Sequence, residues 1–224
     1  MRNLQHIKAV TLDVGGTLIR PWPSVGHVYS EVAARHGHGI ITPETLNLQF
    51  AAAWRAKAGF DHSRRAWLEV VTRTFAGLMP ESSVQGFFSD LYDRFARREA
   101  WQVFDDVHPA LTTLRERGLK LGIISNWDER LRPLLDRLEL TPWFQVIVVS
   151  AEVGFPKPAR EIFAHAASLL GASPASILHV GDSAAEDIAG AESAGFQAVL
   201  LDRKATTDST ASIHRLDALS VFLR

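Results

Sequence analysis

Residues 10–19 read V-T-L-D-V-G-G-T-L-I. An apolar strand here ends at Asp13 and then meets two glycines, which let the backbone bend sharply and let a ligand approach closely. A carboxylate at the carboxyl end of a strand lies where open α/β sheets bind their ligands. The segment therefore makes Asp13 a candidate functional residue, although an ordinary Asp-Gly turn at the end of a strand would produce the same pattern.

Four further apolar runs resemble this strand, and none of them alternates with polar residues. Continuous Val, Ile and Leu are typical of strands that are covered on both faces, as in a parallel sheet. The five predicted strands are residues 7–13, 119–125, 145–149, 177–181 and 197–201. The predicted helices between them are residues 107–117, 129–138, 159–170 and 184–194. This alternation predicts a Rossmann-like open α/β fold with a parallel sheet of about five strands.

One long interval breaks the alternation of strands and helices. Between residues 21 and 101 the sequence has helical patterns but no convincing strand, and four of the six tryptophans fall in this interval or at its edges. The predicted helices of the interval are residues 25–35, 43–57, 64–78 and 82–98. We therefore predict two domains: an α/β core from residues 1–20 and 102–224, and an all-helical inserted cap from residues 21–101.

The composition excludes several functional classes. The chain has 224 residues, 46% of them hydrophobic, a net charge of -1 and no cysteine. The near-neutral charge gives no reason to expect nucleic acid or an anionic membrane as a partner, and without cysteine neither disulfides nor thiolate metal sites can form. No apolar run approaches the ~20 residues needed to span a bilayer, and residues 1–14 lack the pattern of a signal peptide. We expect a soluble, cytoplasmic protein.

Polar residues follow a second predicted strand and occupy a proline-rich loop. Residues 121–128 read L-G-I-I-S-N-W-D, so a buried strand ends at Ser125 and Asn126. A hydroxyl and a backbone N–H at this point can hold anionic oxygens, or can simply cap the next helix. Residues 154–158 read G-F-P-K-P, and the prolines restrict the backbone around Lys157. A fixed ammonium can neutralise a carboxylate and a bound phosphate together, although most loop lysines are merely exposed.

Two further acidic residues follow the fourth predicted strand. Residues 179–187 read H-V-G-D-S-A-A-E-D, so Asp182 comes directly after the strand and Asp187 lies about one helical turn into the next helix. Together with Asp13 they would form an oxygen-rich pocket of the kind that suits Mg²⁺. Capping of the helix by Asp182 or Ser183, and attraction of Asp187 to the helix dipole, is the alternative interpretation.

The order of these four elements, at successive strand ends and around a helical insertion, resembles the haloacid dehalogenase superfamily over essentially the whole chain. The chain is similar to the branch that carries a helical cap after the first strand. Within that branch it resembles the group of haloacid dehalogenase-like hydrolase domain-containing protein 3 and rhythmically expressed gene 2 proteins. The stretches that carry this closer likeness are T-L-D-V, I-I-S-N-W-D, S-A-E-V-G-F-P-K-P and H-V-G-D-S.

The resemblance implies a role for each residue of the first three elements. Asp13 would be the nucleophile and would form an aspartyl-phosphate or aspartyl-ester intermediate. Thr17 would hydrogen-bond near it. Ser125 and the N–H group of Asn126 would bind the oxygens of a phosphoryl group, and Lys157 would balance the charge of nucleophile and substrate.

The resemblance also implies a Mg²⁺ cofactor. Asp13, the carbonyl of Gly15 and Asp182 would hold the ion, with Asp187 as a nearby carboxylate. The cap would close over the nucleophile and exclude water. The expected partner is a small phosphorylated molecule, and nothing in the sequence indicates an oligomeric state.

Position 15 departs from the pattern of the family's phosphatases. They usually carry a second aspartate two residues after the nucleophile, which protonates the leaving group, and here that residue is Gly15. General acid–base catalysis contributes roughly 10²–10⁴-fold, or about 3–5 kcal/mol. Three functions stay open: a Mg²⁺-dependent phosphatase with altered turnover, a 2-haloacid dehalogenase-type hydrolase, and a binding or regulatory module that has lost catalysis. Asp182 argues against dehalogenation, because such relatives do not use Mg²⁺ and typically lack this aspartate.

Overall fold

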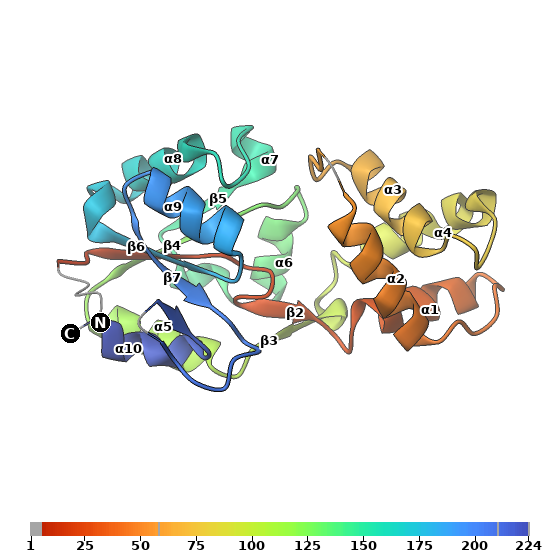
Figure 1. The fold of residues 1–224 in the computed structure, drawn as a ribbon, viewed down its shortest axis with the longest axis horizontal. Coiled ribbons are helices and arrows are strands. Elements are labelled where there is room, and N and C mark those ends of the chain that lie inside the picture. The colour runs from red at the N-terminus through yellow and green to blue at the C-terminus, as the bar shows by residue number, and fades with distance from the viewer. Residues whose placement is uncertain (1–5, 58, 210, 224) are drawn as a thin grey trace. The chain divides into compact units, whose positions relative to one another are not determined.

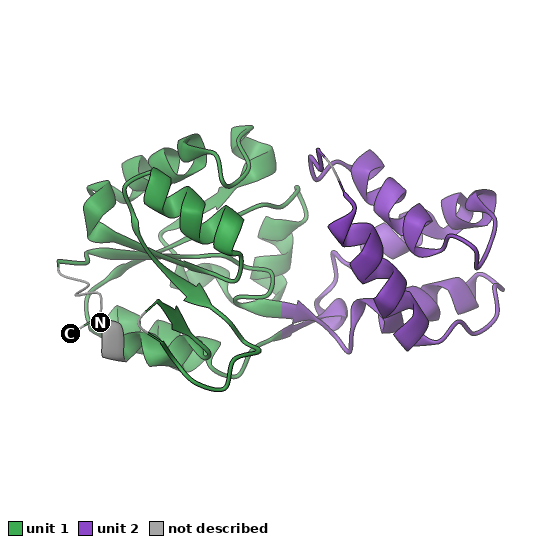
Figure 2. Cartoon of the chain, viewed as in Figure 1, with its two compact units in different colours: residues 1–19, 103–224 green, residues 20–102 purple. Residues whose placement is uncertain are grey.

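The computed structural model describes residues 6–57, 59–209 and 211–223. The chain divides into two compact units (Figure 2). One unit combines Met1–Ile19 with Val103–Arg224, and the other is Arg20–Gln102. That the second unit serves as a cap stays a prediction.

A parallel sheet forms the centre of the first unit (Figure 1). In the part of the chain that the structure describes, its six strands are β1 (Ala9–Leu12), β4 (Lys120–Ser125), β5 (Val146–Val149), β6 (Ile177–Gly181), β7 (Gln197–Leu201) and β8 (Ser212–Ile213). They lie in the order β5-β4-β1-β6-β7-β8, and neighbouring strands run parallel. Every residue of β1 is buried, as expected for a central strand that is covered on both faces. The predicted α/β fold class is confirmed.

Helices cover both faces of this sheet. Figure 1 shows α8 and α9 on one face and α5 and α10 on the other. The helices of this unit are α5 (Val107–Glu116), α6 (Leu131–Arg137), α7 (Ser150–Val153), α8 (Arg160–Leu170), α9 (Gly190–Ser193), α10 (Leu219–Phe222), a π-helix at Ala184–Ala189, and 3₁₀ turns at Thr141–Trp143, Pro174–Ser176 and Leu216–Ala218. Ile124 and Val148 of the sheet join Phe163 and Ala166 of α8 in one buried cluster. Each of the three larger side chains contributes roughly 1.5–3 kcal/mol when it is fully buried, so this cluster fixes α8 on the sheet.

The strand register brings three strand ends together at one edge of the sheet. Leu12 of β1 pairs with Ile123 of β4 on one side and with Val180 of β6 on the other. The chain adds β4 and β5 on one side of β1 and then returns to add β6, β7 and β8 on the other. Open α/β sheets bind ligands at such a reversal of strand order. The residues that follow β1, β4 and β6 are therefore placed to share a site.

Helices make up most of the second unit. Its helices are α1 (Val25–Arg35), α2 (Pro43–Arg55), α3 (Arg64–Thr74), α4 (Glu81–Arg94) and a 3₁₀ turn at Arg98–Ala100. The hydroxyls of Ser24, Thr42 and Ser63 each accept a backbone N–H at the start of a helix, which explains where the first three helices begin. Tyr29 and Phe75 stack in the buried centre with their rings 5.7 Å apart. None of the described helices is long and apolar enough to cross a membrane.

Several short elements were not predicted from the sequence. β2 (Ile19–Pro21) and β3 (Trp101–Val103) pair where the chain passes between the units, and β8 adds a sixth strand to the sheet. Strands of two or three residues are too short to show a periodic pattern. Helix α3 ends at Thr74, before residue 78 where we expected its end, and Gly77, which has a positive φ, lies in the turn beyond it.

The second unit allows a test of its helix packing with two glycines. A Cβ atom at Gly26 in α1 would overlap the carbonyl oxygen of Pro43, whereas a Cβ at Gly86 in α4 would meet nothing within 4 Å. We expect Gly26→Ala to lower the free energy of unfolding by about 2 kcal/mol through overpacking. Gly86→Ala should raise it by about 0.5–1 kcal/mol, because alanine is the better helix former. Urea midpoints of the two variants measure this, and equal shifts would contradict the close approach of α1 to α2.

Candidate active site

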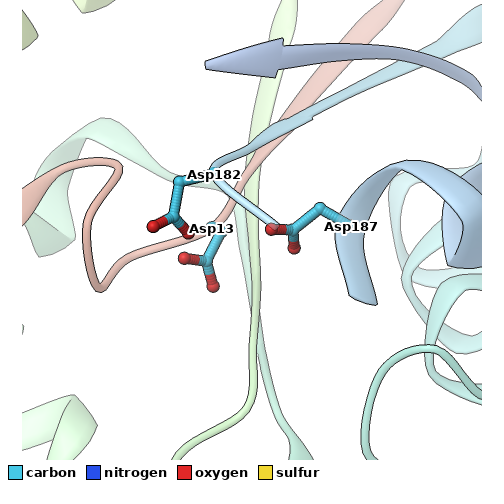
Figure 3. A group of neighbouring side chains, drawn as sticks. All are labelled: Asp13, Asp182 and Asp187. Carbon is cyan, nitrogen blue, oxygen red and sulfur yellow. The ribbon is translucent and has the colours of Figure 1, made fainter. Parts of the chain in front are cut away.

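Three carboxylates gather at the carboxyl edge of the sheet (Figure 3). Asp13 directly follows β1, Asp182 directly follows β6, and Asp187 lies in the π-helix Ala184–Ala189. Each side chain offers an oxygen within 4.8 Å of the others. Asp13 and Asp187 are buried, whereas Asp182 is exposed. The residues predicted to form an acidic pocket thus lie together.

The ammonium of Lys157 lies between two of these carboxylates. Its Nζ is 2.7 Å from Oδ1 of Asp13 and 2.5 Å from Oδ1 of Asp187. Only 2% of the lysine side chain is exposed, so Lys157 is not the solvated loop lysine of the alternative interpretation. Asn126 fixes the loop, because its Oδ1 accepts the N–H of Lys157 at 2.6 Å and its Nδ2 donates to the Lys157 carbonyl at 2.9 Å. This pair of bonds sets the direction from which the lysine enters the site.

Ser125, the last residue of β4, orients the carboxylate of Asp13. Its hydroxyl donates a hydrogen bond to Oδ1 of Asp13 at 3.1 Å. Lys157 contacts the same oxygen, so two donors hold Oδ1, and Oδ2 is left out of both contacts. A carboxylate held in this way keeps one orientation while its second oxygen stays available for chemistry.

A buried histidine supports the cluster from inside the sheet. His179 of β6 is fully buried; its Nε2 lies 3.2 Å from Oδ1 of Asp187 and its Nδ1 lies 2.9 Å from the hydroxyl of Thr11. An ionised carboxylate can only accept hydrogen bonds, so a neutral imidazole carries its proton on Nε2 and accepts from Thr11 at Nδ1. The side chain of Asp187 is thereby held by three donors, His179, Lys157 and the N–H of Ser183.

Burial and charge act in opposite directions on the groups of this cluster. Burial alone would lower the pKa of Lys157, but the charges of Asp13 and Asp187 outweigh it and hold that pKa above its usual range. Burial raises the pKa of Asp13, against the attraction of Lys157. Burial would also raise the pKa of Asp187, but Lys157 and His179 hold it well below its usual range. Burial lowers the pKa of His179, which keeps the imidazole neutral.

Asp182 stands apart from these paired groups. Partial loss of hydration, together with the charges of Asp13 and Asp187, raises the pKa of Asp182 to about 7. Its carboxylate lies so close to the loop after β1 that a Cβ atom at Gly16 would overlap it. Gly16 also has a φ of +79°, a conformation that side chains disfavour. Glycine at this position therefore allows both the turn of the loop and the approach of Asp182.

The backbone of the same loop leaves one carbonyl unused. The carbonyl of Val14 accepts N–H groups from Thr17, Leu18 and Ile19. The carbonyls of residues 16, 17 and 18 each accept a hydrogen bond from outside the loop. Among the described residues, the carbonyl of Gly15 has no hydrogen-bond donor. The oxygen that the resemblance assigns to a cation is thus the one that the fold does not use.

Thr17 does not make the hydrogen bond that we expected near Asp13. Its side chain is buried, and its hydroxyl has no hydrogen-bond partner within the described residues. An unmade hydrogen bond of a buried hydroxyl costs about 1–3 kcal/mol. The role predicted for Thr17 in the reaction stays a prediction.

Four residues around the site were not predicted from the sequence to take part in it. Thr11 and His179 carry a signal, since both are polar residues within buried apolar strands. Trp127 and Arg203 carry none. Their contacts with the loop after β1 join segments that lie far apart in the sequence. A tertiary contact of this kind leaves no local pattern.

Two curated relatives are similar to this chain over most of its length. Haloacid dehalogenase-like hydrolase domain-containing protein 3 of Homo sapiens is 34% identical over 212 residues, which cover 90% of this chain and 84% of that protein. Rhythmically expressed gene 2 protein of Drosophila melanogaster is 28% identical, and the match covers 91% of this chain and 86% of that protein. The resemblance noted in the sequence is confirmed.

Solved structures share the fold. A phosphatase of the haloacid dehalogenase family from Thermococcus onnurineus is 25% identical, with a TM-score of 0.67 over 96% of this chain and 97% of that chain. The hydrolase YfnB of Bacillus subtilis, bound to magnesium, is 20% identical, with a TM-score of 0.76 over 98% and 100%. A 2-haloacid dehalogenase from Pseudomonas syringae is 24% identical, with a TM-score of 0.64 over 96% and 97%.

The family comparison agrees with the relatives and with the fold. Residues 7–195 match the family described as haloacid dehalogenase-like hydrolase. This range includes Asp13, Ser125, Lys157, Asp182 and Asp187, the residues that the fold brings to one edge of the sheet. The chain therefore belongs to the haloacid dehalogenase-like hydrolase family.

Proposed function

We propose that this hydrolase is a Mg²⁺-dependent phosphatase that acts through an aspartyl-phosphate on Asp13. The observation that carries the proposal is the setting of Asp13 at the sheet edge. The ammonium of Lys157 lies 2.7 Å from its carboxylate, and two further carboxylates lie within 4.8 Å. The similarity to the Thermococcus onnurineus phosphatase supports the same class of activity.

The reaction would have two displacements at phosphorus. A carboxylate oxygen of Asp13 attacks the phosphorus, and the bond from phosphorus to the leaving-group oxygen breaks with its electron pair on that oxygen. Water then attacks the phosphorus of the aspartyl-phosphate, and the bond between phosphorus and Asp13 breaks. The carboxylate of Asp13 is restored, and both hydrogens of the water end on phosphate or solvent.

Residues already in contact with Asp13 would stabilise the charge in these steps. The ammonium of Lys157 would neutralise both the nucleophile and the incoming phosphoryl group. Ser125 lies at the end of β4, where its hydroxyl would bind a phosphoryl oxygen together with the N–H of Asn126. The donors that orient the carboxylate before the reaction would thus bind the substrate during it.

The residues fit a Mg²⁺ ion. One ammonium offsets only one of the two carboxylates of Asp13 and Asp187, so the cluster carries an excess of negative charge, and Asp182 adds to it when ionised. All candidate ligands are oxygens, and the unused carbonyl of Gly15 adds a neutral one, a set that suits a hard cation with several bound waters. When bound, the ion would draw charge from the phosphoryl oxygens.

We assign the direct contacts with the ion to Asp13, the Gly15 carbonyl and Asp182. Asp187 is already engaged on both oxygens, by Lys157 and His179 on Oδ1 and by the N–H of Ser183 on Oδ2. We therefore give Asp187 the role of holding Lys157 and the end of β6 in place.

Position 15 determines which substrates this site would favour. Gly15 has no side chain to protonate a leaving group, and a Cβ atom there would lie 3.2 Å from Cζ3 of Trp127. The indole ring thus takes up part of the space that an acidic side chain would need. The proposed substrate is a small phosphorylated molecule, such as an aryl or acyl phosphate, whose leaving group departs without a proton.

We place the enzyme in the cytoplasm as part of the same proposal.

The first test compares leaving groups. With Mg²⁺, we expect kcat/KM for aryl and acyl phosphates to exceed that for alkyl phosphates by roughly 10²–10⁴-fold, the contribution of a general acid. Asp13→Asn should lower the activity on all of them by on the order of 10³-fold or more. Glu161→Gln, which removes an exposed carboxylate of α8, is the control and should leave the activity unchanged.

Two outcomes of this assay would contradict the proposal. Equal rates on aryl and alkyl phosphates would show that another group supplies the proton. Halide release from 2-haloacids that is insensitive to EDTA would instead establish the dehalogenase function.

The second test restores an acid at position 15. Gly15 lacks the positive φ of Gly16, so its backbone accepts an aspartate, but the ring of Trp127 must move. We expect Gly15→Asp alone to raise alkyl-phosphate hydrolysis only slightly. In a Trp127→Ala background the same change should raise it by about 10-fold or more, so the two substitutions are coupled. Identical effects in both backgrounds would contradict the steric role of Trp127.

The third test measures the electrostatic strain at Asp182. The pKa of Asp182 is about 7 in the folded protein, against an ordinary value of 3.8. The free energy of unfolding therefore falls as the pH rises through this range, because the folded state resists ionisation of the group. In EDTA at pH 8, Asp182→Asn should therefore raise the free energy of unfolding by about 1 kcal/mol, a value discounted for the exposure of the group. The gain should shrink as the pH falls toward 5.

Mg²⁺ should reverse this order of stability. A ligand that binds only the folded state raises the unfolding temperature, so the wild type should gain stability from Mg²⁺ and Asp182→Asn should gain little. Thermal unfolding with and without Mg²⁺ measures both effects. Equal Mg²⁺-induced shifts in the two proteins would exclude Asp182 as a ligand.

A further inference from the structure

Arg203 links the end of the sheet to the loop that follows the nucleophile. It lies just beyond β7, and its guanidinium reaches back to the loop after β1. Nε donates to the carbonyl of Gly16 at 3.2 Å, and Nη2 donates to the carbonyl of Thr17 at 2.6 Å. These are the two carbonyls that directly follow Gly15. Arg203 itself has no role in the reaction proposed above.

The guanidinium is itself fixed from two sides. Asp106, which is fully buried, accepts Nη1 at 2.9 Å and Nη2 at 3.0 Å in a bidentate pair. The ring of Phe104 lies against it, with Cζ of Arg203 3.7 Å from the ring centroid. Asp106 also accepts the backbone N–H of Leu216 at 2.6 Å, so its carboxylate cannot turn away. The planar donor group of Arg203 is therefore presented to the loop in one orientation.

Hydrogen bonds of the loop itself and the bonds from Arg203 together fix the loop. Residues 15 and 16 are glycines, which have the largest conformational freedom to lose and no side chain to anchor them. Before Gly15, the carbonyl of Val14 is fixed by three N–H groups of the loop itself. After Gly15, the N–H of Gly16 donates to the carbonyl of Ile19 at 2.8 Å, and the next two carbonyls, those of Gly16 and Thr17, are both bonded by Arg203.

We propose that Arg203 is a positioning residue for the cation site, because it fixes the loop on the far side of Gly15 and so keeps the Gly15 carbonyl available as a ligand. The inference rests on the Mg²⁺ site of the proposed function. Arg203 would not touch the ion or the substrate. It acts through the backbone of Gly16 and Thr17, and Asp106 and Phe104 hold it in place for that purpose.

The test is Mg²⁺ binding by Arg203→Lys, measured by isothermal titration of the full chain with MgCl₂ in the absence of substrate. Lysine keeps the positive charge beside Asp106 but lacks the planar fork, so it cannot reproduce the bonds to both carbonyls. We expect the Kd for Mg²⁺ to rise by about 10-fold or more, the effect typical of residues that orient metal ligands.

Arg132→Lys is the matched control. Arg132 also makes a bidentate pair, with Glu152 at 2.6 and 2.7 Å, and donates to the backbone carbonyl of Ile147 at 2.8 Å. These partners belong to α7 and β5 and not to the loop after β1, so replacing Arg132 should leave the Kd for Mg²⁺ within about twofold of the wild type.

A second variant separates positioning from the general loss of stability. Arg203→Gln combined with Asp106→Asn removes both charges together, so no buried carboxylate is left unpaired. Circular dichroism and urea unfolding establish that each variant is folded. A merely structural role would lower the urea midpoint and leave the Kd of the folded protein unchanged, whereas positioning raises the Kd in both variants.

The outcomes distinguish this inference from the proposed function. If the wild type binds Mg²⁺ and the folded Arg203 variants bind it equally well, the role of Arg203 is overturned and the metal site stands. If the wild type does not bind Mg²⁺ at all, both the metal site and the role of Arg203 are overturned.

Discussion

The contact of one ammonium with two buried carboxylates is the interaction on which the site depends. Asp13 lies at the end of β1 and Asp187 in the π-helix that follows β6, and neither is more than 7% exposed. A buried charge left without its partner costs about 3–5 kcal/mol, so the strand ends could not carry both groups without Lys157. A single ammonium cannot balance a third acid nearby, and burial together with the charges of Asp13 and Asp187 raises the pKa of Asp182. The arrangement that stabilises the buried pair thus creates the demand for a cation.

The two sides of the cluster are fixed by different devices. On the β6 side, buried side chains hold Asp187 in place. Hydrogen bonds from Thr11 to His179 and from His179 to Asp187 connect this acid to the interior of the sheet. On the β1 side, the two glycines of the loop offer no side chain, so the backbone itself is held by hydrogen bonds to its carbonyls. Rigid placement of both sides is what a site needs if it is to stabilise a transition state without rearranging.

The sequence predicted much of this arrangement, and the reasons for its failures are physical. Five apolar runs, three polar strand ends and one proline-rich loop were enough for the fold class and for the gathering of Asp13, Asp182, Asp187 and Lys157, because parallel strands present their carboxyl ends at one edge. The two-residue strand β8 and the β2–β3 pair are too short for any periodicity. The contacts of Arg203 and Trp127 with the loop after β1 depend on chain segments far apart in sequence, so only the folded structure reveals them. The hydroxyl of Thr17 makes no hydrogen bond within the described residues, and its predicted role in the reaction stays a prediction.

The absence of a side chain at position 15 limits the chemistry in a specific way. Lys157, Ser125 and a cation would all act on the charge of the nucleophile and the phosphoryl group, which is the same for every phosphate monoester. None of them acts on the oxygen that leaves. An aryl or carboxylate oxygen tolerates the negative charge that it acquires, whereas an alkoxide requires a proton that Gly15 cannot supply. The missing acid corresponds to about 3–5 kcal/mol, a difference that affects only the poor leaving groups. Selectivity among substrates in such a site would therefore depend first on the leaving group, and only second on contacts with the rest of the substrate.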